Sequence, residues 1–217
     1  MHFNQLQNLL SAARLERYLV ATGGDEERAA RLYRANLKLA QAFHPILGVF
    51  EVVLRNKIDQ ALEVYFNDPD WIINQKRVLG GRLLTQILEA ENRLLGDRIP
   101  VTKGKLIASQ MLGFWTETFS KPTFKILKGS PIHIFKHPPT ALVRADISIR
   151  LNQIRQLRNR INHNEPICFK HQQIDCTEAA VVHQALYAVM DWIDPNIRWL
   201  LQGLDEVQDV LGVMGKI

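Results

Sequence analysis

Apolar side chains recur every three to four residues along most of the chain, and Pro and Gly fall between these periodic stretches. This spacing places apolar side chains on one face of an α-helix. No stretch alternates between apolar and polar residues for long enough to predict a half-buried strand. The chain is therefore predicted to be all-α.

The helices can be placed from these patterns and from their capping residues. The first covers residues 4–20 and stops at Thr22-Gly23-Gly24. Asp25 can cap a second helix that reaches Val64, but Pro45 lacks an amide hydrogen, so we expect one bent helix or two helices in tandem. Five more are expected at residues 83–94, 106–118 (capped by Thr102), 141–163, 177–192 and 195–211.

Residues 120–140 interrupt the helical pattern with five Pro or Gly residues, and we expect an irregular connection with one helical turn. No acidic residue lies between Glu117 and Asp146, whereas four lysines and Arg144 do, so this stretch carries the whole excess of the chain's 27 Lys and Arg over its 22 Asp and Glu. Such clustering favours contact with a polyanion, although a solvated loop has the same composition. The predicted RNA-binding lysines here are Lys121, Lys125, Lys128 and Lys136.

Composition narrows the class of protein. With 47% apolar and 23% charged residues among 217, the chain is globular rather than disordered. It has two cysteines and opens without the pattern of a secretory signal, which predicts a cytoplasmic protein. Polar residues interrupt the longest apolar region, residues 37–54, so no membrane association is expected.

The helix predicted at residues 141–163 has two contrasting faces. Its apolar stripe consists of Ile147, Leu151, Ile154, Leu157 and Ile161. At about 100° per residue, Arg155, Asn159 and Asn162 lie on the opposite side, with Arg158 and His163 at its margins. This face is either a solvated surface beside a helix end that favours a cationic His, or a binding site.

Three segments resemble a known family. Leu157–Ile167 (LRNRINHNEPI) resembles the Arg-polar-x3-His signature of the Abi-like (abortive infection) proteins of the HEPN superfamily, all-α ribonucleases. The segment from Tyr33 to Asp59, with Glu51, Arg55 and Asn56, is similar to the first long helix of that family. The segment from Met111 to Ser120 is similar to its Gly-Phe-Trp segment. The order of the three is also that of the family.

The resemblance implies a single HEPN-like helical bundle over residues 1–217, with a helical N-terminal part at 1–24 and a basic insertion at about 120–140. It implies a metal-independent endoribonuclease of phage defence, whose partners are RNA, a second copy, and an antitoxin or a phage-derived trigger. The catalytic residues would be Arg158, Asn159 and His163. Glu51, Arg55, Asn56 and Asn162 would support them, and Arg155 and Arg160 would join the four lysines in binding RNA. A non-catalytic module that binds RNA or a protein and dimerises is the alternative.

The chemistry agrees with these residue types, because RNA carries its own nucleophile, the 2′-hydroxyl. Histidine can act as general acid or base near neutral pH, and arginine presents a planar fork to phosphate oxygens. On one ideal helix, however, Arg158 and His163 point about 140° apart. We therefore expect two copies of the motif to complete the site across a homodimer. Glu51 is expected to pair with one of the arginines, in a catalytic or a purely structural role.

Other candidate sites are weaker. Cys168, His171, Cys176 and His183 fit no familiar zinc spacing, so no metal site is predicted. His133 and His137 are expected at the surface or facing RNA, and Trp115, Trp192 and Trp199 in the core. The chain lacks the glycine-rich phosphate-binding motifs and the Gly-x-Ser-x-Gly motif, and no cofactor is predicted.

Overall fold

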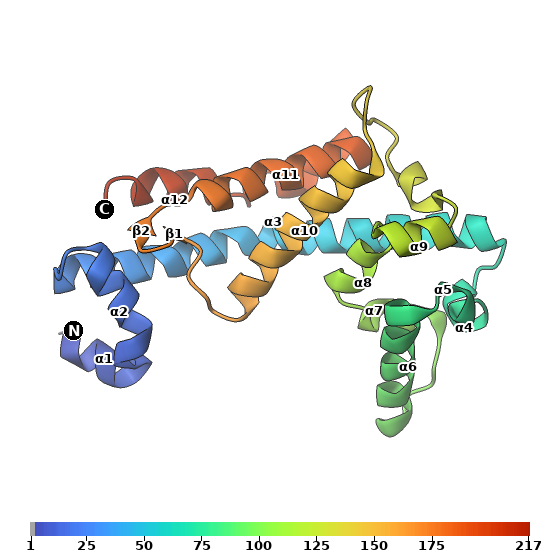
Figure 1. The fold of residues 1–217 in the computed structure, drawn as a ribbon, viewed down its shortest axis with the longest axis horizontal. Helices are drawn as coiled ribbons and strands as arrows, with labels where there is room; N and C mark the ends of the chain where they lie inside the picture. The colour runs from blue at the N-terminus through green and yellow to red at the C-terminus, as the bar shows by residue number, and fades with distance from the viewer. Residues whose placement is uncertain (1–2) are drawn as a thin grey trace.

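The computed structural model describes residues 3–217 and consists almost entirely of helices arranged around one long helix (Figure 1), which confirms the all-α prediction. The elements are α1 (Phe3–Leu10), α2 (Ala12–Ala21), α3 (Glu26–Phe66), α4 (Trp71–Asn74), α5 (Lys76–Leu79), α6 (Gly81–Gly96), α7 (Lys103–Ser109), α8 (Leu112–Glu117), α9 (Lys121–Ile126), the 3₁₀-helix η1 (Ser130–Ile134), α10 (Arg144–Asn162), β1 (Phe169–Lys170), β2 (Gln173–Ile174), α11 (Thr177–Ile193), the 3₁₀-helix η2 (Pro195–Leu201) and α12 (Val207–Met214). In Figure 1, α6 projects away from the body of the molecule, and both termini lie at the opposite end.

Helix α3 is a single helix of 41 residues. The carboxylate of Asp25 accepts a hydrogen bond from the amide of Arg28 at 2.9 Å, and Glu26 and Glu27 place negative charge in the first turn, where the helix dipole favours it. Pro45 does not divide the helix, so of the two expected arrangements the single helix is observed. The helix ends at Asn67, which takes the left-handed conformation.

The core is built along α3. Its buried side chains include Phe43, Phe50 and Leu54, and they belong to one cluster of buried apolar residues that extends from Phe3 to Met214. By length and composition alone α3 could span a membrane, but the core helix of a soluble protein meets the same criteria. The cytoplasmic location therefore stays a prediction.

Several boundaries differ from those predicted. The first expected helix is divided at Ser11, which has a φ of 75° and caps α2 through its hydroxyl. The helix capped by Thr102 is divided near Gln110 into α7 and α8. Segment 120–140 contains both α9 and η1, more helix than the single turn expected. The short helices α4 and α5 and the hairpin of β1 and β2 were not predicted.

Helix α10 matches its predicted apolar stripe. All five stripe residues, from Ile147 to Ile161, are buried. Helix α10 packs against α11 and α8, and Figure 1 shows it crossing α3 obliquely. Trp115 of α8 is fully buried, as predicted, whereas Trp199 is 73% exposed, so its assignment to the core was wrong. In η2 the ring of Trp199 lies on the solvent side, while Ile197 and Leu201 face the core.

Candidate functional site

The predicted polar face of α10 is anchored to α3 by an ion pair. Nη2 of Arg158 lies 3.3 Å from Oε2 of Glu51, and each side chain is 22% exposed. The pairing of Glu51 with an arginine of the neighbouring helix is therefore confirmed. The guanidinium has further N–H groups beyond the one that contacts Glu51, and these can donate to a phosphate.

Asn159 and His163 are differently exposed. Asn159 is half-buried, whereas Asn162 and His163 are exposed. Among the residues that the structure describes, none of the three side chains has a hydrogen-bond partner. The exposed side chains of Asn162 and His163 are thus available to a ligand, and His163 carries the imidazole of the motif.

The turn after α10 is held by backbone hydrogen bonds. His163 is the C-terminal cap, and its amide donates to the Asn159 carbonyl at 2.9 Å. Asn164 takes a left-handed φ of 54°, and the amide of Glu165 donates to the carbonyl of Arg160 at 2.8 Å. From α2, Arg14 donates to the carbonyl of Asn164 at 2.9 Å. The backbone that carries His163 is therefore fixed at both the helix end and the turn.

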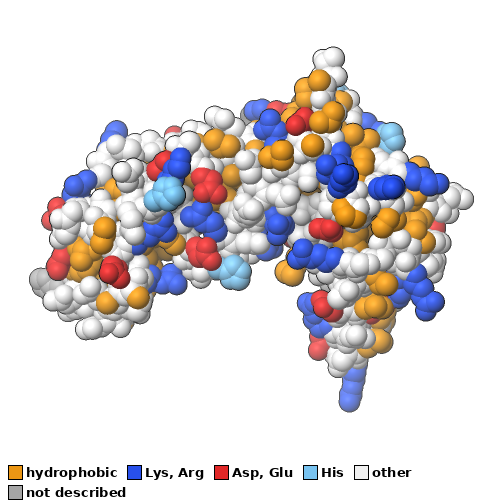
Figure 2. Space-filling view, viewed as in Figure 1, with side chains coloured by type: hydrophobic (Ala, Val, Ile, Leu, Met, Phe, Trp, Pro, Cys, Tyr) orange, Lys and Arg blue, Asp and Glu red, His pale blue; other side chains and the backbone are white. Residues whose placement is uncertain are grey.

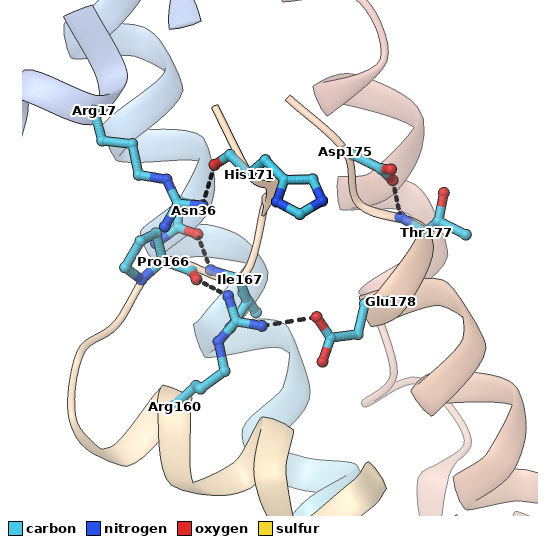
Figure 3. A network of polar contacts seen from close by, with 9 residues as sticks. All are labelled: Arg17, Asn36, Arg160, Pro166, Ile167, His171, Asp175, Thr177 and Glu178. Carbon is cyan, nitrogen blue, oxygen red and sulfur yellow. Dashed lines mark hydrogen bonds and ion pairs between the residues drawn. The ribbon is translucent and has the colours of Figure 1, made fainter. Parts of the chain in front are cut away.

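Arg160 contributes to a separate polar network beside this turn (Figure 3). Its guanidinium pairs with Glu178 of α11 at 2.8 Å and donates to the carbonyl of Pro166. The amide of Ile167 donates to the buried Oδ1 of Asn36 in α3 at 2.8 Å. Arg160 thus ties the segment after α10 to α11, and its predicted contact with RNA would compete with these bonds.

Arg155 lies one turn earlier on α10. Its Nη2 donates to Asn152 at 3.2 Å, and its side chain passes beside Gly113, where an added Cβ would lie 3.8 Å from its Cδ. Gly113 of the Gly-Phe-Trp segment is therefore a neighbour of α10 at Arg155, two residues before the segment with the Arg-polar-x3-His motif begins. The third segment, from Tyr33 to Asp59, contributes Glu51, which pairs with Arg158.

The remaining predicted residues of α3 do not join this contact. Arg55 is half-buried and Asn56 is exposed, and neither side chain has a polar partner among residues 3–217. The sequence predicted both as supporting residues, and that role stays a prediction.

The four lysines of segment 120–140 are all exposed and form no ion pair within the described part of the chain. They belong to α9, to the turn after it and to the bend that follows η1. This segment lies beside the C-terminal part of α3, where the hydroxyl of Tyr65 donates to the Ile126 carbonyl at 3.3 Å. Along α3, Tyr65 is 14 residues from Glu51, or about 21 Å. The lysines are therefore separate from the α10 motif.

Figure 2 shows Lys and Arg side chains over both regions, and a concave edge between the α1–α2 end and the projecting α6. In Figure 1 the C-terminal end of α10 faces this edge. Acidic side chains are interspersed with the basic ones along it.

A buried polar cluster was missed because its members are distant in sequence. Nε2 of His183 lies 2.7 Å from Oδ2 of Asp205, which also accepts from the hydroxyl of Tyr187 at 2.7 Å. Gln208 lies 3.0 Å from Nδ1 of the same imidazole. The sequence grouped His183 with the cysteines instead. Among the described residues, no three His, Cys, Asp or Glu side chains form a group that could hold a metal ion.

The two thiols are close to each other but weakly reactive. Burial, and to a lesser extent the neighbouring Cys176, raises the pKa of Cys168 to about 12. Burial also raises the pKa of Cys176. Both groups are protonated at neutral pH, which disfavours a nucleophilic role.

Comparison of the whole chain with known proteins gives no relative. No protein-family model, curated protein or solved structure gave a significant match. The Abi-like family therefore stays a resemblance of three sequence segments.

Proposed function

We propose that this protein is a metal-independent endoribonuclease that acts as an abortive-infection toxin in phage defence. The observation that carries the proposal is the state of the motif. Arg158 is held half-buried on α10 by Glu51, and His163 lies exposed at the end of the same helix, without a polar partner among residues 3–217. This combination provides one fixed cation and one accessible acid-base group. The role in defence follows from the family resemblance only.

The proposed reaction uses the 2′-hydroxyl of the RNA as nucleophile. That oxygen attacks the adjacent phosphorus, the bond to the 5′-oxygen breaks, and the products are a cyclic phosphate and a 5′-hydroxyl. His163 accepts the proton of the 2′-hydroxyl while water protonates the leaving 5′-oxygen, or it donates a proton to that oxygen while water accepts the proton of the 2′-hydroxyl. Arg158 binds the phosphate and stabilises the charge that grows on it. Asn159 lies beside Arg158 and orients the ribose.

A single copy of α10 separates these groups. Five residues correspond to a rotation of about 140° and a rise of about 7.5 Å between Arg158 and His163. The proposed active site therefore contains Arg158 of one protomer and His163 of its partner, related by a two-fold axis beside α10.

One observation favours the second candidate function, a non-catalytic module that binds RNA or a protein. Glu51 neutralises part of the charge on Arg158, which is typical of a structural ion pair. In that case the exposed residues of α10 would bind a partner without reacting with it.

Cleavage of total RNA by the purified full-length chain in EDTA distinguishes the two. The enzyme proposal predicts cleavage at discrete positions, with cyclic phosphate ends identified by end mapping. Intact RNA that nevertheless co-migrates with the protein would favour the binding module. Cleavage that stops in EDTA and returns with magnesium would contradict the mechanism.

A further inference from the structure

A cavity of about 470 Å³ lies between the C-terminal part of α3 and the segment around η1. It is lined by Lys57, Gln60, Ala61, Val64 and Tyr65 of α3, by Lys128, Ser130, His133, Ile134 and Lys136, and by Ile193 of α11. Along α3 its centre is about ten residues, or about 15 Å, from Glu51. It is thus separate from the motif on α10.

The rim of the cavity is cationic. Lys57, Lys128 and Lys136 are exposed, and none of them forms an ion pair among the described residues. No acidic side chain lines the cavity. Outside the lining, Asp194 interacts electrostatically with Lys57, although its pKa is lowered chiefly by the amide of Asn196 and least by Lys57. The cavity therefore carries three lysines on its rim and no carboxylate in its lining.

The wall of the cavity is apolar. Ala61, Val64, Ile134 and Ile193 contribute aliphatic surface, and the ring of Tyr65 lies among them. This surface is short, because it covers about one turn of α3 and single residues elsewhere. It fits a ring system or a compact aliphatic group, whereas a long acyl chain would extend beyond it.

One buried hydroxyl lacks a partner. Ser130 lines the cavity and is 8% exposed, and its Oγ forms no hydrogen bond. A buried hydroxyl without a partner is destabilising, so native proteins seldom retain one. The Oγ itself is shielded from solvent, so a rotation of the Ser130 side chain is needed to bring the hydroxyl to a phosphate oxygen in the cavity.

We propose that this cavity binds a phosphomonoester carried on a compact apolar body of about the size of a nucleoside monophosphate. The lysines contact the phosphate, Ser130 donates to one of its oxygens, and the aliphatic wall covers the apolar part. The group can come from a free small molecule or from the phosphorylated end of an RNA strand. The proposal does not depend on catalysis at Arg158 and His163.

Calorimetric titration of the full chain with 1-naphthyl phosphate tests the proposal, with inorganic phosphate and 1-naphthol as the two half-ligands. The complete ligand is expected to bind at least tenfold more tightly than either half. If inorganic phosphate bound as tightly as 1-naphthyl phosphate, the cavity would be a general anion-binding surface. If decanoate bound as tightly or more tightly, the proposed class of ligand would be wrong. No binding at millimolar concentration would overturn the site.

Substitutions in the lining of the cavity test whether the ligand binds there. Combined replacement Lys57→Gln and Lys136→Gln is expected to weaken binding about tenfold, because two exposed charge contacts are lost. Val64→Glu, at a position 82% exposed, places a negative charge in the cavity without loss of core packing and should have a similar effect. Lys38→Gln, at an exposed position near the other end of α3, is the control and should leave binding unchanged. Unchanged binding in the cavity variants would place the ligand elsewhere.

Ser130→Ala distinguishes a ligand contact from a structural residue. It removes an unsatisfied hydroxyl, so Tm should stay constant or rise while binding weakens. A trinucleotide with or without a 5′-phosphate is then used to compete with 1-naphthyl phosphate. This competition distinguishes a free small molecule from the phosphorylated end of an RNA strand as the natural ligand. Displacement only by the phosphorylated trinucleotide identifies an RNA end, and displacement by neither identifies a free small molecule. Equal displacement by both would show that the phosphate is not recognised.

Discussion

At the scale of single residues, His163 is exposed, whereas Arg158 is half-buried and pairs with Glu51. Their replacements should therefore differ in their effect on the free energy of unfolding. Under the endoribonuclease proposal, His163→Ala and Arg158→Ala should each lower the cleavage rate by about 10²- to 10⁴-fold. His163→Ala should change the free energy of unfolding by less than about 0.5 kcal/mol, because the side chain is exposed. Single-turnover cleavage and urea denaturation measure the two effects.

His44→Ala provides the matched control, since His44 is exposed on α3 and forms no contact with the motif in the described residues. It should cleave RNA at the wild-type rate. A loss of only about twofold in His163→Ala would make His163 a structural residue.

The ion pair of Glu51 with Arg158 should stabilise the fold. Glu51→Gln leaves a half-buried guanidinium without its counterion, so the free energy of unfolding should fall by about 1–2 kcal/mol. The control is Glu27→Gln, because Glu27 is 84% exposed and its pair with Arg31 spans 3.9 Å. Its effect should be below about 0.5 kcal/mol in urea denaturation. Equal effects of the two variants would show that the Arg158 pair has no special role in stability.

At the scale of elements, Asp205 links α11 to the start of α12. Although burial raises its pKa, the hydrogen bonds from Tyr187 and His183 dominate, and the net pKa lies below its ordinary value of 3.8. A group whose pKa is lower in the folded state contributes stability above the unfolded pKa and loses it as pH falls through the folded pKa. The wild type should therefore lose stability below about pH 4, in part through Asp205.

The measurement is the free energy of unfolding against pH for the wild type and Asp205→Asn. The variant should be less stable at pH 7 and should show a shallower decline below pH 4. Parallel curves would mean that Asp205 has the same pKa in the folded and unfolded states.

The elements also show what the sequence can predict. The stripe of α10 and the caps Asp25 and Thr102 were predictable because helix periodicity and capping depend on neighbours in sequence. The division at Ser11 was not, because a serine with positive φ has no clear sequence signal. Pairing of Glu51 was foreseen from the predicted neighbouring helices, whereas the contacts of Arg160 with Glu178 and of His183 with Asp205 depend on tertiary packing.

At the scale of the whole molecule, the proposed active site requires two copies of the chain. We expect a homodimer whose interface includes residues 158–163, because one copy cannot bring Arg158 and His163 together. Light scattering at micromolar concentration should give about twice the mass of 24.9 kDa. Mixing Arg158→Ala with His163→Ala should restore part of the cleavage, since a heterodimer retains one complete site. A strict monomer, or a dimer in which mixing restores nothing, would contradict the composite site.

The most direct test of the account is the dependence of cleavage on the 2′-hydroxyl. Once a cut site is mapped, the wild-type protein is given two RNA oligonucleotides in EDTA that differ only by a hydrogen in place of that 2′-hydroxyl. The unmodified RNA should be cut to a cyclic phosphate, and the 2′-deoxy RNA should stay intact at that position. Cleavage of both at the same rate would contradict the proposed mechanism.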